Sequence, residues 1–145
     1  MQFIDLAAQR ARIGDKIDLA VSKVIREGKY ILGPEVAEFE RKLADYVGVK
    51  HVVACANGTD ALLIPLFAFG IGRGDAVFCP SFTFAATAEV VALAGAEPVF
   101  IDIDPDTYNI DIVQLKAAIQ AIKTEGRLTP KAIIPVDLFG LAADY

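Results

Sequence analysis

The segment Asn57-Gly58-Thr59-Asp60 has the residue types of an anion-binding turn. It follows a short apolar run, His51 to Cys55, and precedes a run that we expect to be helical. Backbone N–H groups at a helix N-terminus are free to bind an anion, Gly58 allows close approach, and the Thr59 hydroxyl adds a donor. A helix N-terminus that is merely capped by Asn or Asp explains the same pattern. The spacing matches neither a dinucleotide-binding fingerprint nor a P-loop.

Two further segments place chemically useful groups at predicted strand ends. Pro80-Ser-Phe-Thr-Phe84 puts aromatic rings where a flat ligand ring could stack, although two core phenylalanines are the alternative. Asp137 ends an apolar strand-like run, where an acid either binds a ligand or caps the next turn. The pair Asp102 and Asp104 indicates a solvated strand end rather than a metal site.

A metal site is not predicted, because His51 is the sole histidine and the cysteines lack a ligand spacing. Cys55 and Cys79 lie in apolar runs, and we expect both to be buried, reduced thiols at strand ends.

The elements that must position these groups alternate between helical and strand-like patterns, which predicts a three-layer α/β fold with a mostly parallel sheet. Ligands of such sheets bind beyond the carboxyl ends of the strands. Pro65 predicts a kink or a late start in its helix, and Asp111 could cap the helix that follows it. The expected helices are 14–27, 36–46, 61–69, 82–93 and 112–123, and the expected strands are 51–55, 76–79, 98–102 and 132–137.

Composition excludes several classes of protein. The 145 residues carry a net charge of −5 without a Lys/Arg cluster, so nucleic-acid binding is not expected. The longest uncharged run, 76–88, contains Pro80, Ser81 and two threonines, which argues against a membrane span. The N-terminus lacks the pattern of a signal peptide. We therefore expect a soluble, cytoplasmic protein.

Taken together, the motifs resemble the DegT/StrS group of nucleotide-sugar aminotransferases along nearly the whole chain. The resemblance implies the large domain of a fold-type I enzyme that uses pyridoxal 5'-phosphate (PLP) and works as a homodimer. It implies an N-terminal arm and helix over 1–35 and the first, incomplete part of the PLP-binding domain over 36–145. The matching segments are 3–6, 30–36, 55–62, 72–75, 80–88, the Val-Phe-Ile-Asp-Ile-Asp and Tyr-Asn-Ile-Asp motifs, and Ile-Ile-Pro-Val at 133–136.

The resemblance also implies site roles, with a nucleotide-linked keto sugar as substrate and glutamate as the usual amino donor. Gly58 and Thr59 would hold the cofactor phosphate with Asp60 beside them. Phe84 would stack on the pyridine ring, and Asp137 would lie near the cofactor's edge. The segment with Tyr30, Gly33 and Pro34 would line the substrate cleft near the dimer interface.

Two departures accompany the resemblance: Phe139-Gly140-Leu141 replaces the usual Tyr-Gly-Gln, and Pro65 is unusual behind the phosphate turn. The Schiff-base lysine of the family would lie later than Tyr145, so we expect this chain alone to be inactive and truncated. Two alternatives stay open. One is a sugar dehydratase on the same fold with the lysine replaced, and the other is a nucleotide- or phosphate-binding module without covalent chemistry.

Overall fold

The computed structural model describes residues 4–145, which form two compact units. The first unit ends at Ala54, and the second comprises Cys55–Tyr145. Each unit is described by itself below. The predicted domain boundary after residue 35 stays a prediction. The division after Ala54 reflects contacts within the chain and does not define domains. No helix within residues 4–145 combines the length and apolarity that a membrane crossing requires.

The first unit contains helices α1 (Leu6–Glu27) and α2 (Pro34–Val47). Helix α1 begins earlier than the apolar stripe predicted, because the Asp5 carboxylate caps it by accepting the Ala8 N–H at 2.9 Å. Helix α2 ends at Gly48, as predicted, where a left-handed backbone (φ 76°) returns the Gly48 N–H to a helix carbonyl.

The strand predicted over 51–55 is not formed. A strand needs a neighbouring backbone for its N–H and C=O groups, and the strand pairs among residues 4–145 all involve later segments. The Ala54 N–H instead donates to the Glu40 carboxylate at 2.8 Å. The prediction was wrong because apolar composition alone does not supply a pairing partner.

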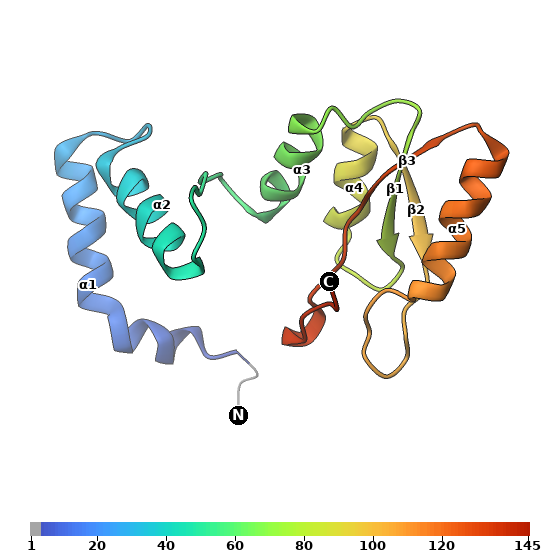
Figure 1. Cartoon of the computed structure of the whole chain (residues 1–145). Coiled ribbons are helices and arrows are strands. Elements are labelled where there is room, and N and C mark those ends of the chain that lie inside the picture. The colour runs from blue at the N-terminus through green and yellow to red at the C-terminus, as the bar shows by residue number, and fades with distance from the viewer. Residues whose placement is uncertain (1–3) are drawn as a thin grey trace. The chain divides into compact units, whose positions relative to one another are not determined.

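The second unit is built on a three-stranded parallel sheet in the order β2-β1-β3, with β1 in the middle (Figure 1). The helices α3 and α4 lie on one side of the strands and α5 on the other (Figure 1). The element bounds are α3 (Gly58–Ala68), β1 (Asp75–Pro80), α4 (Ala86–Leu93), β2 (Glu97–Ile101), α5 (Ile112–Glu125), β3 (Thr129–Ile133) and the 3-10 helix η1 (Leu138–Gly140).

Successive side chains of β1 point to opposite faces of the sheet, and a hydrophobic core forms on each face. Val77 faces α3 and α4 and packs with Leu66 and Val90, whereas Ala76 and Phe78 face α5 and pack with Leu115. All six residues are buried. This arrangement confirms the predicted three-layer α/β class with a parallel sheet.

Three elements of the second unit have bounds that differ from the predictions by three residues or more. Helix α3 starts at Gly58 and continues through Pro65, so the late start was wrong. The helix expected from Phe82 begins at Ala86, because residues 82–85 form an irregular turn. Strand β3 occupies 129–133 rather than 132–137; it includes Pro130 beside a register irregularity, which an edge strand tolerates.

Candidate functional site

The predicted phosphate turn lies at the N-terminus of α3. Asn57 is the cap residue: its side-chain oxygen accepts the Asp60 N–H at 2.9 Å, and its backbone oxygen accepts the Ala61 N–H at 3.1 Å. The Asp60 carboxylate in turn accepts from the Asn57 amide nitrogen at 3.1 Å. Local hydrogen bonds between these residues therefore set the start of the helix.

Two backbone donors remain at this turn. Among residues 4–145, the N–H groups of Gly58 and Thr59 donate to no other group. A Cβ atom added to Gly58 would meet nothing within 4 Å, so the space beside the turn is open. Thr59 is half-buried and adds a hydroxyl next to these donors. This set of donors fits a phosphate group.

Phe84 lies in the irregular turn between β1 and α4, and the residue is 77% exposed. Hydrogen bonds hold the turn on both sides of Phe84 in the sequence. The Ser81 N–H donates to the Ile101 carbonyl at 2.7 Å, and the hydroxyls of Thr83 and Thr87 share a hydrogen bond at 2.9 Å. Phe84 is therefore not the core residue of the alternative interpretation; its ring is available to a ligand.

Asp137 does not end strand β3, which stops at Ile133; it lies immediately before the 3-10 helix η1. One carboxylate oxygen accepts the Ala143 N–H at 2.8 Å and the Tyr145 hydroxyl at 3.1 Å. The hydrogen bond to Asp137 raises the pKa of Tyr145. The carboxylate therefore organises residues 137–145 into a closed loop.

An aromatic cluster made of Phe82, Tyr108 and Phe139 also forms in this unit. The ring centroids are 5.8 Å apart for Phe82 and Tyr108, 6.2 Å for Phe82 and Phe139, and 5.6 Å for Tyr108 and Phe139. Sequence reasoning missed Tyr108 and Phe139 as members of one cluster. The available signal was an aromatic residue in each segment that follows a strand, β1, β2 or β3.

In the first unit, the candidate substrate residues surround a cavity of about 400 Å³ formed by residues 28–34. The Tyr30 hydroxyl donates to the Ile25 carbonyl at 3.1 Å, and Pro34 is the first residue of α2. Gly33 caps that helix, and a Cβ there would clash with the Lys29 carbonyl. These residues belong to a different unit from Gly58, Phe84 and Asp137.

Residues 11–145 match the DegT/DnrJ/EryC1/StrS aminotransferase family. The chain belongs to this family. It is 56% identical to UDP-2-acetamido-2-deoxy-3-oxo-D-glucuronate aminotransferase of Pseudomonas aeruginosa, with 100% of this chain and 38% of that protein covered.

Solved structures that are similar to this chain have the same fold. A crystal structure of a DegT DnrJ EryC1 StrS aminotransferase from Brucella abortus is 72% identical with a TM-score of 0.97, covering 100% of this chain and 39% of the other. The structure of ntda from Bacillus subtilis with bound cofactor PMP is 34% identical with a TM-score of 0.76, covering 90% and 28%. The chain thus spans about two-fifths of the length of the relatives it matches.

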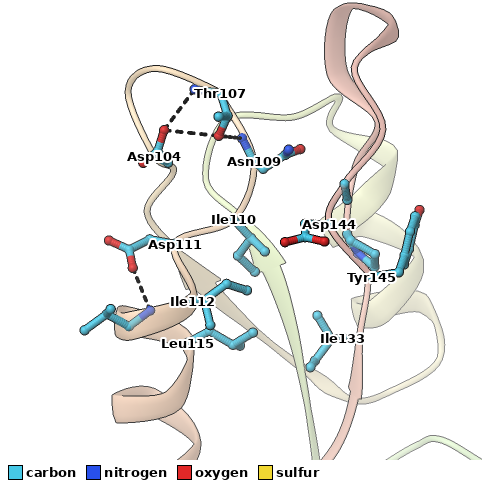
Figure 2. Close-up of a pocket in the computed structure, with 13 residues that line it drawn as sticks. Asp104, Thr107, Asn109, Ile110, Asp111, Ile112, Leu115, Ile133, Asp144 and Tyr145 are labelled. Atoms are coloured by element: carbon cyan, nitrogen blue, oxygen red, sulfur yellow. Dashed lines mark hydrogen bonds between the residues drawn. The ribbon is translucent and has the colours of Figure 1, made fainter.

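This member of the DegT/DnrJ/EryC1/StrS family also has a cavity of about 880 Å³ on the α5 side of the sheet. Figure 2 shows its wall, with the turn that carries Asp104, the start of α5 at Asp111, and the C-terminal residues Asp144 and Tyr145. The lining contains three aspartates and neither lysine nor arginine. A phosphate group would be repelled there, so the α3 turn fits a phosphate better than this larger cavity does.

Proposed function

We propose that this chain is part of an enzyme that transfers an amino group to a keto group on a nucleotide-linked sugar, with PLP as cofactor. Glutamate is the proposed amino donor, and the product would serve as a precursor of polysaccharides or other glycans. The relative from Pseudomonas aeruginosa is named as an aminotransferase of a UDP-linked 3-oxo sugar, which supports this substrate class.

The observation that carries the proposal is the pair of unused N–H donors at Gly58 and Thr59. They lie in the first turn of α3, where the aligned peptide dipoles place a partial positive charge. A dianionic phosphate monoester accepts such donors well, and the half-buried Thr59 hydroxyl adds a third hydrogen bond. Gly58 lacks a side chain that would hold the phosphate away.

The remaining residues fit the other parts of the cofactor. Phe84 presents an exposed ring that can stack on the flat pyridine ring, and Asp137 is proposed to lie near its edge. Asp60 stabilises the turn through its hydrogen bond with Asn57. When bound, PLP acts as an electron sink for the bond that is broken at the substrate carbon.

The proposal also covers the substrate cleft, the Schiff-base lysine and the location of the protein in the cell. Tyr30, Gly33 and Pro34 are proposed to line the substrate cleft, next to the interface of a homodimer. The Schiff-base lysine is proposed to lie past Tyr145, so residues 1–145 alone would not catalyse transamination. We propose a cytoplasmic location, because nucleotide-linked sugars are made there.

The test uses the protein encoded by the complete reading frame that contains this chain. It is incubated with glutamate and a nucleotide-linked keto sugar, and 2-oxoglutarate and the amino sugar are measured. Binding of pyridoxamine phosphate is titrated for wild type and for Thr59→Val, which removes one donor to the phosphate. We expect the variant to bind about tenfold more weakly. The matched control is Thr124→Val, since the Thr124 hydroxyl donates within α5 to the Gln120 carbonyl.

The outcomes separate the alternatives. Amino transfer together with weaker binding by Thr59→Val supports the proposal. Loss of water from the sugar without amino transfer would instead indicate the dehydratase. Binding of a nucleotide or inorganic phosphate, without any affinity for PLP or pyridoxamine phosphate, would indicate a non-catalytic binding module.

A further inference from the structure

The aromatic cluster of Phe82, Tyr108 and Phe139 joins three segments that are far apart in the sequence. Phe82 follows β1, Tyr108 lies in the turn after β2, and Phe139 lies in η1, after β3. Each ring is within 6.2 Å of the other two, measured between centroids, and Tyr108 and Phe139 meet edge to face with an interplanar angle of 89°. Such pairs attract each other beyond the area that they bury.

Two of the three residues have an unusual backbone. Tyr108 has φ 61° and Phe139 has φ 55°, both in the left-handed region that side chains other than those of Gly, Asn and Asp rarely adopt. The Tyr108 backbone is held by its N–H bond to the Asp104 carbonyl at 2.8 Å. Strained backbone persists only where the surrounding contacts require it, and it concentrates at functional sites.

The cluster lies next in the sequence to two of the candidate cofactor residues of this unit, Phe84 and Asp137. Phe82 precedes Phe84 by two positions in the same short turn, and Phe139 follows Asp137 by two positions. Phe84 itself remains 77% exposed, whereas Phe82 is 46% exposed and contacts Tyr108. The loop that bears Phe84 and the loop that bears Asp137 are therefore in contact through the rings of Phe82 and Phe139.

We propose that Tyr108 is a positioning residue of the cofactor site. Its ring contacts Phe82 and Phe139 together, and so holds the Phe84 loop and the Asp137 loop at a fixed separation around one bound pyridine ring. Tyr108 does this without touching the cofactor. The inference rests on the proposed function, because it assigns Phe84 and Asp137 to that site.

The experiment distinguishes the role of the Tyr108 ring from that of its left-handed backbone. Asn accepts a left-handed backbone but lacks an aromatic ring, so Tyr108→Asn removes the ring contacts without adding strain. Tyr108→Phe keeps the ring. Phe69→Asn is the matched control, because Phe69 is 73% exposed at the C-terminal end of α3, away from the cluster. Phe139→Asn tests the same contact from the other loop, and since Phe139 is 78% exposed its loss uncovers little apolar surface.

Each variant is made in the protein from the complete reading frame. The readouts are the Kd for pyridoxamine phosphate, the induced circular dichroism of bound PLP, and the urea midpoint of unfolding. We expect Tyr108→Asn and Phe139→Asn to weaken binding about tenfold and to reduce the dichroism, since two ring pairs are lost. Tyr108→Phe and Phe69→Asn should match wild type in both.

The possible failures are distinguishable. If wild type binds pyridoxamine phosphate and Tyr108→Asn binds it equally well with the same dichroism, the positioning role is wrong and the proposed function stands. If wild type binds neither form of the cofactor, both are wrong. A lower urea midpoint for Tyr108→Asn with unchanged affinity would also overturn the inference, because that is the result of a purely structural role.

Discussion

The carboxylate of Asp104 accepts two hydrogen bonds from Thr107, one from the backbone N–H at 2.9 Å and one from the hydroxyl at 3.1 Å. The same oxygen accepts the Asp106 N–H at 3.0 Å. These bonds close the turn that places Tyr108 in the aromatic cluster. They also lower the pKa of Asp104 below its ordinary value of 3.8, with the Thr107 backbone bond as the largest cause.

This turn should therefore loosen in acid. A carboxylate with a lowered pKa stabilises the folded state above its ordinary pKa, and that contribution is lost as the pH falls through the lowered value. We expect the turn to stay closed above the ordinary pKa of 3.8 and to open progressively as the pH falls below it. The amide resonances of Asp106 and Thr107, followed by NMR during an acid titration, report the change. In Asp104→Asn the same resonances should show no such titration, and if they titrate as in wild type, another group controls the turn.

The backbone between α1 and α2 should tolerate only glycine at position 33. A Cβ on Gly33 would collide with the Lys29 carbonyl, which is backbone and cannot swing away. We expect Gly33→Ala to destabilise the first unit by about 2 kcal/mol. Gly14→Ala is the control, because Gly14 lies within α1 and the nearest atom to its added Cβ is 3.9 Å away. That change should stabilise by about 0.5–1 kcal/mol. Urea unfolding followed by far-ultraviolet circular dichroism measures both, and equal midpoints for the two variants would refute the steric argument.

The core of the second unit should depend on Phe78 far more than on Phe100. Phe78 is 1% exposed on the central strand, whereas Phe100 on the neighbouring strand is 58% exposed. Phe78→Ala should cost about 3–5 kcal/mol, from lost burial and the cavity that remains. Phe100→Ala should cost about 1 kcal/mol or less. Urea denaturation of the two variants measures both losses of stability. Similar losses would show that Phe100 is covered by a part of the protein outside residues 4–145.

The two cysteines should react differently with iodoacetamide. Both are free thiols, but Cys55 is exposed whereas Cys79 is buried in β1, where burial raises its pKa. At neutral pH we expect Cys55 to be alkylated quickly and Cys79 only after denaturation. Peptide mass spectrometry at timed intervals distinguishes the sites. Cys55→Ser should leave the native protein almost unreactive, and fast labelling of that variant would place Cys79 at the surface.

The prediction that both thiols are buried was therefore wrong for Cys55. An apolar run indicates burial only if another element covers it. His51–Cys55 has apolar composition, yet it forms no strand, and Val53 is 80% exposed. Cys79 has similar neighbours in the sequence, but β2 and β3 pair with its strand on both sides.

The sequence by itself determined the local features of this protein. Asn57 begins α3, Asp111 begins α5 by accepting the Val113 and Gln114 N–H groups, and Gly48 ends α2. Each of these features depends on hydrogen bonds that span only a few residues, so residue types at short spacing are sufficient to predict them. The alternation of helical and strand-like hydrophobic patterns predicted the α/β class, because these periodicities are likewise local.

Only the tertiary structure decided which distant segments meet. The contact of Tyr108 with Phe82 and Phe139, the exposure of Phe84, and the closing of the C-terminal loop by Asp137 depend on the order and register of the strands. No short motif encodes such contacts, because their energy comes from packing between residues that the chain brings together only when the sheet forms.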